Sequence, residues 1–447
     1  MTEGTIMDKL IAFALPLALS SILQLMFNAV DIIVVGRFTG KEALAAVGAT
    51  TALISLFSNF FIGVSLGANV MTARYYASGA KKRLSDTVHT SLTVALIGGV
   101  LMVFIGWFGA GPALRIMGTP ESVIGQSELY MRIYFLGMPF FMLYNYGAAI
   151  LRAVGDTKRP LLFLIISGVA NALLNMYLVI VFKLGVAGVA SATVFSQMIS
   201  CVLVITTLMK TEGAYRFEPS KLGITPVCLK QIMIIGMPAG IQSMVISLSN
   251  SLLQSSVNSF GDIAMAGYTA ANNIFGFLYV SVNAVSQACM SFTSQNYGAG
   301  KPKRMDKVLI DCVILEIAFP LVLGSAVYFF GSDILGIYNT DPRVIAYGLE
   351  VLAYTTVPYF ICGLMDLFPG ALRGMGHSGI PMVLSVLGTV GMRVFWIYCI
   401  FPMHRSLTFL FLSYPLSWTV TLLMQIVCYY FVRKKVHREL LKKNGNK

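Results

Sequence analysis

The sequence predicts an all-α polytopic membrane protein with twelve transmembrane helices in two pseudo-twofold-related six-helix bundles around a central cavity. Of its 447 residues, 57% are hydrophobic and only 11% are charged, whereas a soluble domain carries about 25% charged residues. The apolar residues form long continuous runs, while a membrane β-barrel would show short alternating segments. An internal repeat divides these runs into two sets of six. Soluble enzymes, secreted disulfide domains and disordered regulators are therefore excluded.

Twelve segments are long and apolar enough to cross a bilayer, which requires about 20 residues each. They are predicted at 13–35, 44–75, 87–110, 123–150, 161–182, 188–209, 231–258, 264–296, 308–330, 343–371, 381–403 and 408–432. A longer polar connection, 210–230, lies near the middle of the chain. The predicted domains are an N-terminal six-helix lobe (1–209), a cytoplasmic linker (210–230), a C-terminal six-helix lobe (231–432) and a basic cytoplasmic tail (433–447).

The basic residues predict the orientation in the membrane. Lys and Arg residues number 24 in the loops and ends on one side and 6 on the other. Because basic loops stay in the cytoplasm, we expect a multi-pass protein of the cell membrane with both termini cytoplasmic. The bilayer then accounts for the formal net charge of +13 without a nucleic-acid partner. No small-residue cleavage site follows the first apolar run, so we expect the first helix to remain in the membrane.

The two halves of the chain repeat each other. LRAVGDTKRP at 151–160 matches LRGMGHSGIP at 372–381, and YYASGAKKR at 75–83 matches NYGAGKPKR at 296–304, both at an offset of 221 residues. Each half has six spans, so the second begins on the same side of the membrane as the first. Two such halves suit alternating access, in which they rock about a binding site near the midplane.

Asp31 is the clearest ionisable residue inside a predicted span, and such residues usually mark function. It shares one helix face with Gln24 and Asn28, and its repeat counterpart is the apolar Leu253. It could instead end the helix at the interface near Arg37. The apolar run that continues after Asp31 favours the functional interpretation.

Further polar residues lie within spans of both halves. Asn171, Asn175 and Thr193 would supply oxygen ligands for a hard monovalent cation, or they could join packed helices. Amides at Gln242, Asn250, Gln254 and Asn272 suit a permissive organic substrate, with the same structural alternative. Asp366 and Arg393 could pair with each other or act in transport, and Glu316 could face solvent or a neighbouring polar group.

The sequence motifs of common enzyme families and of ATP-driven transporters are absent. There is no GxxxxGK[ST], HExxH, GxSxG or GxGxxG, and the seven Cys and four His residues lack metal-binding spacing. We therefore expect neither an enzyme nor a bound cofactor. An ion gradient, a partner or a downhill flux must supply the energy.

The sequence resembles the multidrug and toxic compound extrusion (MATE) family over nearly its whole length. The resemblance rests on Pro16 followed by DIIVVG at 31–36, on the paired loops LRAVGD (151–156) and LRGMG (372–376), and on GVAGVASAT at 185–193. It implies export of organic cations and drugs in exchange for H+ or Na+. It also implies a compact monomer, and a bacterial source is our expectation from the subfamily.

The resemblance also implies site residues. The cation-coupling residues would be Asp31, Asn171, Asn175 and Thr193, and Asp31, Asn171 and Asn175 would be metal ligands if the ion is Na+. The family commonly has Asp where this chain has Asn175, which leaves one carboxylate and favours H+. The expected substrate cavity contains Gln24, Asn28, Gln242, Asn250, Gln254, Asn272 and Asp366.

Two other functions stay open at this point. A flippase for a lipid-linked saccharide would need more cationic residues in the lumen than Arg393 and Arg132. A metabolite exporter on the same fold would share every feature above. The function predicted from the sequence is a cation-coupled antiporter that works by alternating access.

Overall fold

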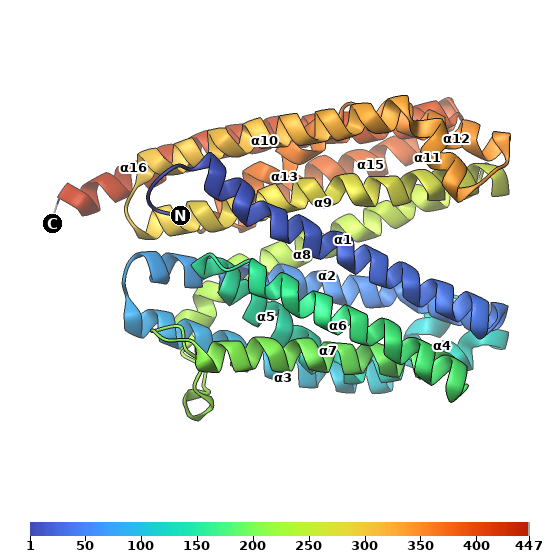
Figure 1. The fold of residues 1–447 in the computed structure, drawn as a ribbon. Helices are drawn as coiled ribbons and strands as arrows, with labels where there is room; N and C mark the ends of the chain where they lie inside the picture. The colour runs from blue at the N-terminus through green and yellow to red at the C-terminus, as the bar shows by residue number, and fades with distance from the viewer. Residues whose placement is uncertain (446–447) are drawn as a thin grey trace. The chain divides into compact units, whose positions relative to one another are not determined.

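The computed structural model describes residues 1–445, and helices account for nearly all of them (Figure 1). The first half contains α1 (Met7–Phe38), α2 (Lys41–Ala77), α3 (Lys81–Ile116), α4 (Glu121–Leu136), α5 (Met138–Val154), α6 (Lys158–Met176) and α7 (Gly185–Lys210). The second half contains α8 (Pro226–Asn258), α9 (Asp262–Gly298), α10 (Pro302–Phe329), α11 (Gly331–Tyr338), α12 (Pro342–Thr355), α13 (Tyr359–Gly374), α14 (Gly379–Ser385), α15 (Met392–Phe395) and α16 (Leu407–Gly445). No strand occurs in residues 1–445, which confirms the predicted all-α class.

The helices account for the twelve predicted spans. Ten helical segments are each long and apolar enough to cross a membrane, and two bent pairs complete the set. The pair α4–α5 bends by 46° and the pair α12–α13 by 52°. Pro139 and Pro358 lie at these breaks, where proline removes a backbone hydrogen bond. Pro238, by contrast, lies within the single helix α8.

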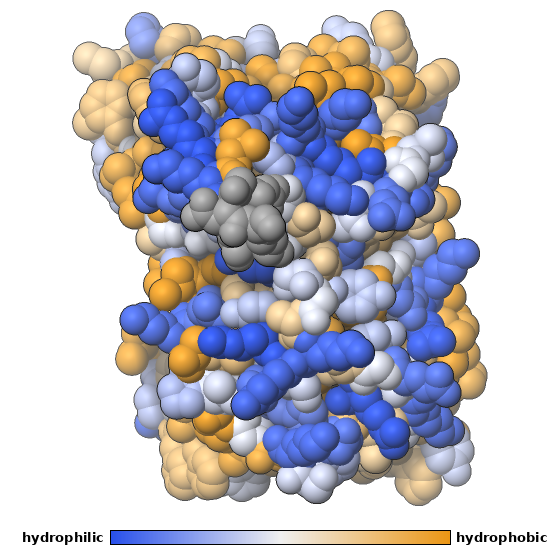
Figure 2. Space-filling view, turned by 90° about the vertical axis from the view of Figure 1, so that its left-hand side faces the viewer, coloured by the Kyte–Doolittle hydropathy of each residue, from blue (hydrophilic) through white to orange (hydrophobic). Residues whose placement is uncertain are grey.

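Side-chain exposure shows where the lipid and the water lie. On α3, Ile97, Leu101, Phe104 and Phe108 form a stripe at helical spacing and are 55–73% exposed, as expected for a face in contact with lipid. Figure 2 looks onto helix ends that include the N terminus and the α9–α10 turn. Hydrophilic residues gather at these helix ends, which include a predicted cytoplasmic loop.

The element bounds confirm the internal repeat. α2 and α9 both contain 37 residues, and they begin 221 positions apart. The starts of α6 and α14 are separated by the same interval. The turns before α2 and α9 use Gly40 and Gly261, whose φ angles are 92° and 93°. Since this region disfavours residues with a Cβ, the same turn requires glycine in both halves.

The structure divides into two compact units that differ from the sequence-based lobes. One unit is Leu19–Gly236, and the other combines Met1–Ala18 with Met237–Lys447. The start of the chain groups with the second half because Leu10, Phe13 and Leu17 pack in a buried cluster with Phe292 and its neighbours. Phe13 and Phe292 make an edge-to-face contact with ring centroids 5.6 Å apart.

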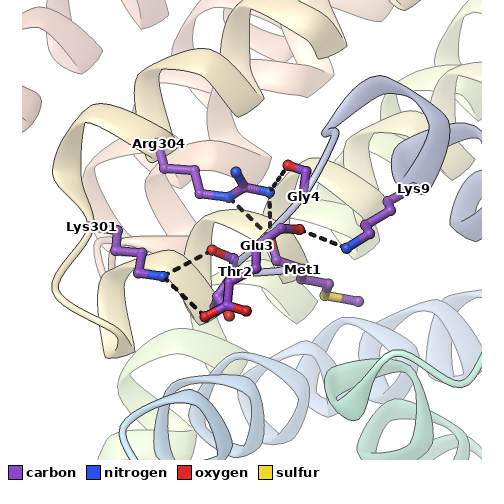
Figure 3. A network of polar contacts seen from close by, with 7 residues as sticks. All are labelled: Met1, Thr2, Glu3, Gly4, Lys9, Lys301 and Arg304. Atoms are coloured by element: carbon purple, nitrogen blue, oxygen red, sulfur yellow. Dashed lines mark hydrogen bonds and ion pairs between the residues drawn. The ribbon is translucent and has the colours of Figure 1, made fainter.

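Polar contacts tie down the segment before α1 as well (Figure 3). Arg304 donates hydrogen bonds to the carbonyl oxygens of Met1 and Gly4, and Lys301 donates to the carbonyl of Thr2 at 3.1 Å. Two basic residues, one in the α9–α10 turn and one in the first turn of α10, therefore hold three backbone carbonyls of this segment.

The connection between the halves is shorter and better anchored than the predicted linker. It runs from residue 211 to 225 and contains a 3₁₀ turn at Pro219–Lys221. The backbone N–H groups of Glu218, Gly223 and Thr225 donate to the side chains of His89, Thr93 and Thr90 on α3. This segment therefore belongs firmly to the Leu19–Gly236 unit.

The predicted basic tail continues the last helix. α16 runs without a break to Gly445, and Arg433 donates two hydrogen bonds to Asp306 of α10, at 2.6 and 2.8 Å. The tail is thus attached to the C-terminal unit at its beginning. Side chains beyond residue 442 lie outside the described part of the chain.

Glycines bring α2 and α8 into backbone contact, because a residue without a side chain allows helices to approach closely. A Cβ on Gly67 would lie 2.2 Å from the carbonyl oxygen of Ile232, and one on Gly236 would lie 2.3 Å from that of Val64. Neither backbone atom can move aside as a flexible side chain could. The two glycines therefore set the distance between these helices.

We expect Gly236→Ala to lower the free energy of unfolding by about 1–3 kcal/mol, because it overpacks a backbone contact. Gly48→Ala is the matched control on α2, since a Cβ there meets nothing within 4 Å. The control should be neutral or stabilise by up to about 1 kcal/mol through helix propensity. Thermal unfolding of both variants in detergent measures the difference, and equal midpoints would contradict the assignment.

Candidate functional site

The Leu19–Gly236 unit joins the predicted carboxylate to two predicted amides. Asp31 lies on α1, and its Oδ1 accepts a short hydrogen bond from Nδ2 of Asn175 on α6. The same Nδ2 donates to Oδ1 of Asn171 at 3.0 Å. One amide therefore bridges two acceptor oxygens from different helices.

The local structure of α6 places these amides. Asn171 and Asn175 are one turn apart, so their side chains share a face, and both are buried. Directly after Met176 the helix widens into a π-helical turn, Tyr177–Val181. Such turns are rare and occur frequently at functional sites.

Gly168 of α6, which has no side chain, lets α1 approach α6. A Cβ on Gly168 would lie 1.8 Å from the ring of Phe27. Phe27 precedes Asp31 by about one helical turn, and Gly168 precedes Asn171 by three residues. The contact between Phe27 and Gly168 therefore sets the approach that brings Asp31 to Asn175.

The carboxyl group of Asp31 has no basic partner within 4 Å among the described residues. Tyr130 and Tyr134 of α4 lie near enough to interact with its charge. Oδ1 of Asn175 is buried and accepts no hydrogen bond from the described part of the chain. A carboxylate flanked by amides and an unused acceptor can hold a proton or a monovalent cation.

Other predicted residues of this unit lie outside the bridged group. The hydroxyl of Thr193 donates to the carbonyl of Val189 on its own helix at 3.1 Å. Gln24 and Asn28 are exposed on α1. Thr193 therefore does not join the hydrogen-bonded set of Asp31, Asn171 and Asn175 in this structure.

The C-terminal unit is the one that combines Met1–Ala18 with Met237–Lys447. Its helix α8 carries a polar stripe of Gln242, Asn250, Gln254 and Asn258, which binds two guanidinium groups. Arg373 of α13 donates to Oε1 of Gln242 at 2.7 Å, and Arg393 of α15 donates to Oδ1 of Asn250 at 2.8 Å. Further along the stripe, Gln254 donates to Asn258 at 2.9 Å. The sequence predicted the amides, but neither arginine partner could be deduced from spacing along the chain.

Asp366 and Arg393 do not form the ion pair that their positions made possible. The guanidinium of Arg393 instead lies 4.7 Å from the ring centroid of Tyr414, and it is flanked along the chain by π-helical turns at Val386–Gly391 and Trp396–Ile400. The backbone carbonyl of Asp366 accepts from Ser286, and its side chain is half-buried. Asn272 is exposed on α9.

Comparisons with known proteins show the family of the chain. The model of the MatE family matches the chain twice, over residues 16–177 and 238–399. The probable multidrug resistance protein YoeA of Bacillus subtilis is 31% identical, over 95% of this chain and 93% of its own. A protein of Shewanella oneidensis described as an FAD transporter is 23% identical, over 95% and 94%.

A solved structure described as a crystal structure of MATE in complex with MaL6 superposes with a TM-score of 0.91 at 19% identity, covering 97% of this chain and 98% of that one. The two family matches begin 222 residues apart, one residue more than the interval between the repeated helices, which confirms the predicted repeat. The chain is therefore a multi-pass membrane transporter rather than an enzyme, and it belongs to the MatE family.

Proposed function

We propose that this protein is a cation-coupled antiporter that exports organic cations and drugs by alternating access, with Asp31 as its coupling residue. The observation that carries the proposal is the half-buried carboxylate of Asp31, which is held by the amide of Asn175 and has no basic partner in contact. An acidic group within a spanning helix is costly, and it usually binds what the protein moves.

The chemistry of the bridged group supports the proton as the coupling ion. The amide nitrogen of Asn175 stands between the oxygens of Asp31 and Asn171, where Na+ would need oxygen ligands. Only one carboxylate is present to balance the charge of a bound metal ion. A protonated Asp31 needs only one acceptor, and the unused Oδ1 of Asn175 becomes available when the amide turns over.

The proposed cycle follows from these contacts. A proton arriving from outside neutralises Asp31 and weakens its charge-assisted bond to Asn175, which frees α1 to shift against α6. Substrate leaves to the outside, the loaded carrier turns inward, and the proton is released as the next substrate binds. A charge moving through about 100 mV supplies about 2.3 kcal/mol, equal to roughly a 40-fold gradient of a neutral substrate.

A second candidate is the export of an anionic metabolite. Arg373 and Arg393 both reach the polar stripe of α8, and Arg393 has no carboxylate partner among the described residues. Such groups suit a phosphate or carboxylate, and one relative is described as an FAD transporter. We also propose that the protein acts as a monomer in the cell membrane of a bacterium, with both termini in the cytoplasm.

We expect Asp31→Asn to reduce gradient-driven ethidium transport in proteoliposomes by about tenfold or more, because the neutral side chain cannot exchange a proton. A pH gradient and a Na+ gradient are imposed separately on wild-type protein. Uptake driven by the pH gradient alone identifies the proton, and uptake driven by Na+ alone would overturn that choice. Undiminished transport by the variant would contradict the role of Asp31.

We expect Gly168→Ala to impair transport although it changes no polar group, because the new Cβ would displace Phe27 and move Asp31 away from Asn175. Gly125→Ala on α4 is the control, since a Cβ there meets nothing within 4 Å. The same ethidium assay compares the two at equal protein density. Equal rates for both variants would show that the approach of α1 to α6 does not matter for coupling.

A further inference from the structure

Glu316 is a carboxyl group in the middle of a spanning helix that the proposed cycle leaves unused. It lies at the centre of α10 and is 0% exposed. Neither of its carboxyl oxygens has a hydrogen-bond partner among the described residues. This distinguishes it from Glu128 on α4, which Arg132 contacts at 2.5 Å.

The neighbouring helices pack closely around the carboxyl group of Glu316. A Cβ on Gly363 of α13 would lie 2.4 Å from Oε2 of Glu316 and 3.3 Å from the side chain of Val282 on α9. The titratable groups that interact with Glu316 are Asp366 and Cys362 on α13, Cys289 on α9 and Cys312 on its own helix. None of these can supply a positive charge.

An ionised carboxylate in these surroundings would cost several kcal/mol, since neither water nor a donor nor a cation compensates for its burial. The burial of Glu316 without a donor or a cation therefore favours the neutral carboxylic acid. A neutral acid without hydrogen bonds does not hold helices together. Its presence calls for an explanation other than packing.

The internal repeat shows that the fold does not require an acid here. The counterparts of Glu316 and Gly363 in the first half are Ala95 and Met142, both buried in one hydrophobic cluster. There a large side chain from α5 faces a small one on α3. The second half reverses the sizes, with the large side chain on α10 and glycine on α13, and only this arrangement carries a carboxyl group.

We propose that Glu316 is a second proton-binding site, in the C-terminal unit, and that its proton crosses the membrane together with the proton on Asp31. In this proposal the proton reaches Glu316 by way of Asp366, which follows Gly363 by about one turn of α13 and interacts with Glu316. No bond is made or broken except the O–H bond that each carboxyl group forms and releases. This inference rests on the proposed proton-coupled function.

The number of protons can be measured as a limiting gradient. With the membrane potential clamped at zero by K+ and valinomycin, one pH unit sustains about a tenfold substrate ratio for each proton exchanged. We expect wild-type proteoliposomes to reach about a 100-fold ethidium ratio and Glu316→Gln to reach about tenfold. Glu128→Gln, which changes an ion-paired acid, should match the wild type. A tenfold limit for the wild type, or an unchanged limit for Glu316→Gln, would overturn the proposal.

A second measurement does not depend on transport. Infrared difference spectra of purified protein should show the carbonyl stretch of a protonated carboxylic acid that Glu316→Gln lacks and Glu128→Gln retains. Identical spectra would contradict the neutral state of Glu316. If wild-type protein builds no ethidium gradient from a pH gradient, the proposed function itself fails, and the second proton site fails with it.

Discussion

A membrane-spanning segment has no water with which to satisfy its backbone, and this constraint governs the whole structure. Each N–H and C=O group in the bilayer must find its partner within the chain, and helices provide that partner locally. The apolar stripe on α3 that includes Leu101 and Phe104 needs no further explanation. Every polar side chain within the spans requires an explanation, because solvation by water does not offset the cost of its burial.

The two carboxyl groups that we assign to coupling occur where the two halves differ. Asp31 corresponds to Leu253, and Glu316 corresponds to Ala95. The shared residues, such as Gly40 and Gly261, build the same turns twice. The repeat thus provides the scaffold, and the departures from it carry the chemistry that we assign to coupling.

The sequence predicts the helices well because their signals are local. Hydropathy locates the spans, and the two bent pairs of helices break beside Pro139 and Pro358. It also placed Asp31 with Asn171 and Asn175, although Thr193 turned out to bond to its own helix. The partners of Arg393 were not predictable, because the contact with Asn250 joins residues 143 positions apart and depends on how α15 turns between two π-helical segments.

Burial was equally hard to predict for Glu316. The burial of Glu316 depends on Gly363, which lies on another helix. A glycine leaves no periodic signal in the sequence. The grouping of the first residues with the second half has a similar cause. Leu10 and Phe13 resemble any other apolar residues of a span until their partners on α9 are known.

The anchoring of the inter-half connection has a mechanical consequence. Because Glu218, Gly223 and Thr225 are bonded to α3, the loop is fixed within the Leu19–Gly236 unit and does not connect the two units. The chain passes from one unit to the other inside α1, after Ala18, and inside α8, after Gly236. Pro16 and Pro238 lie within two residues of these crossings, and each leaves a carbonyl of its helix without a donor. The two crossings between the units therefore lie in helices that proline weakens, and not in the loop that connects the halves of the sequence.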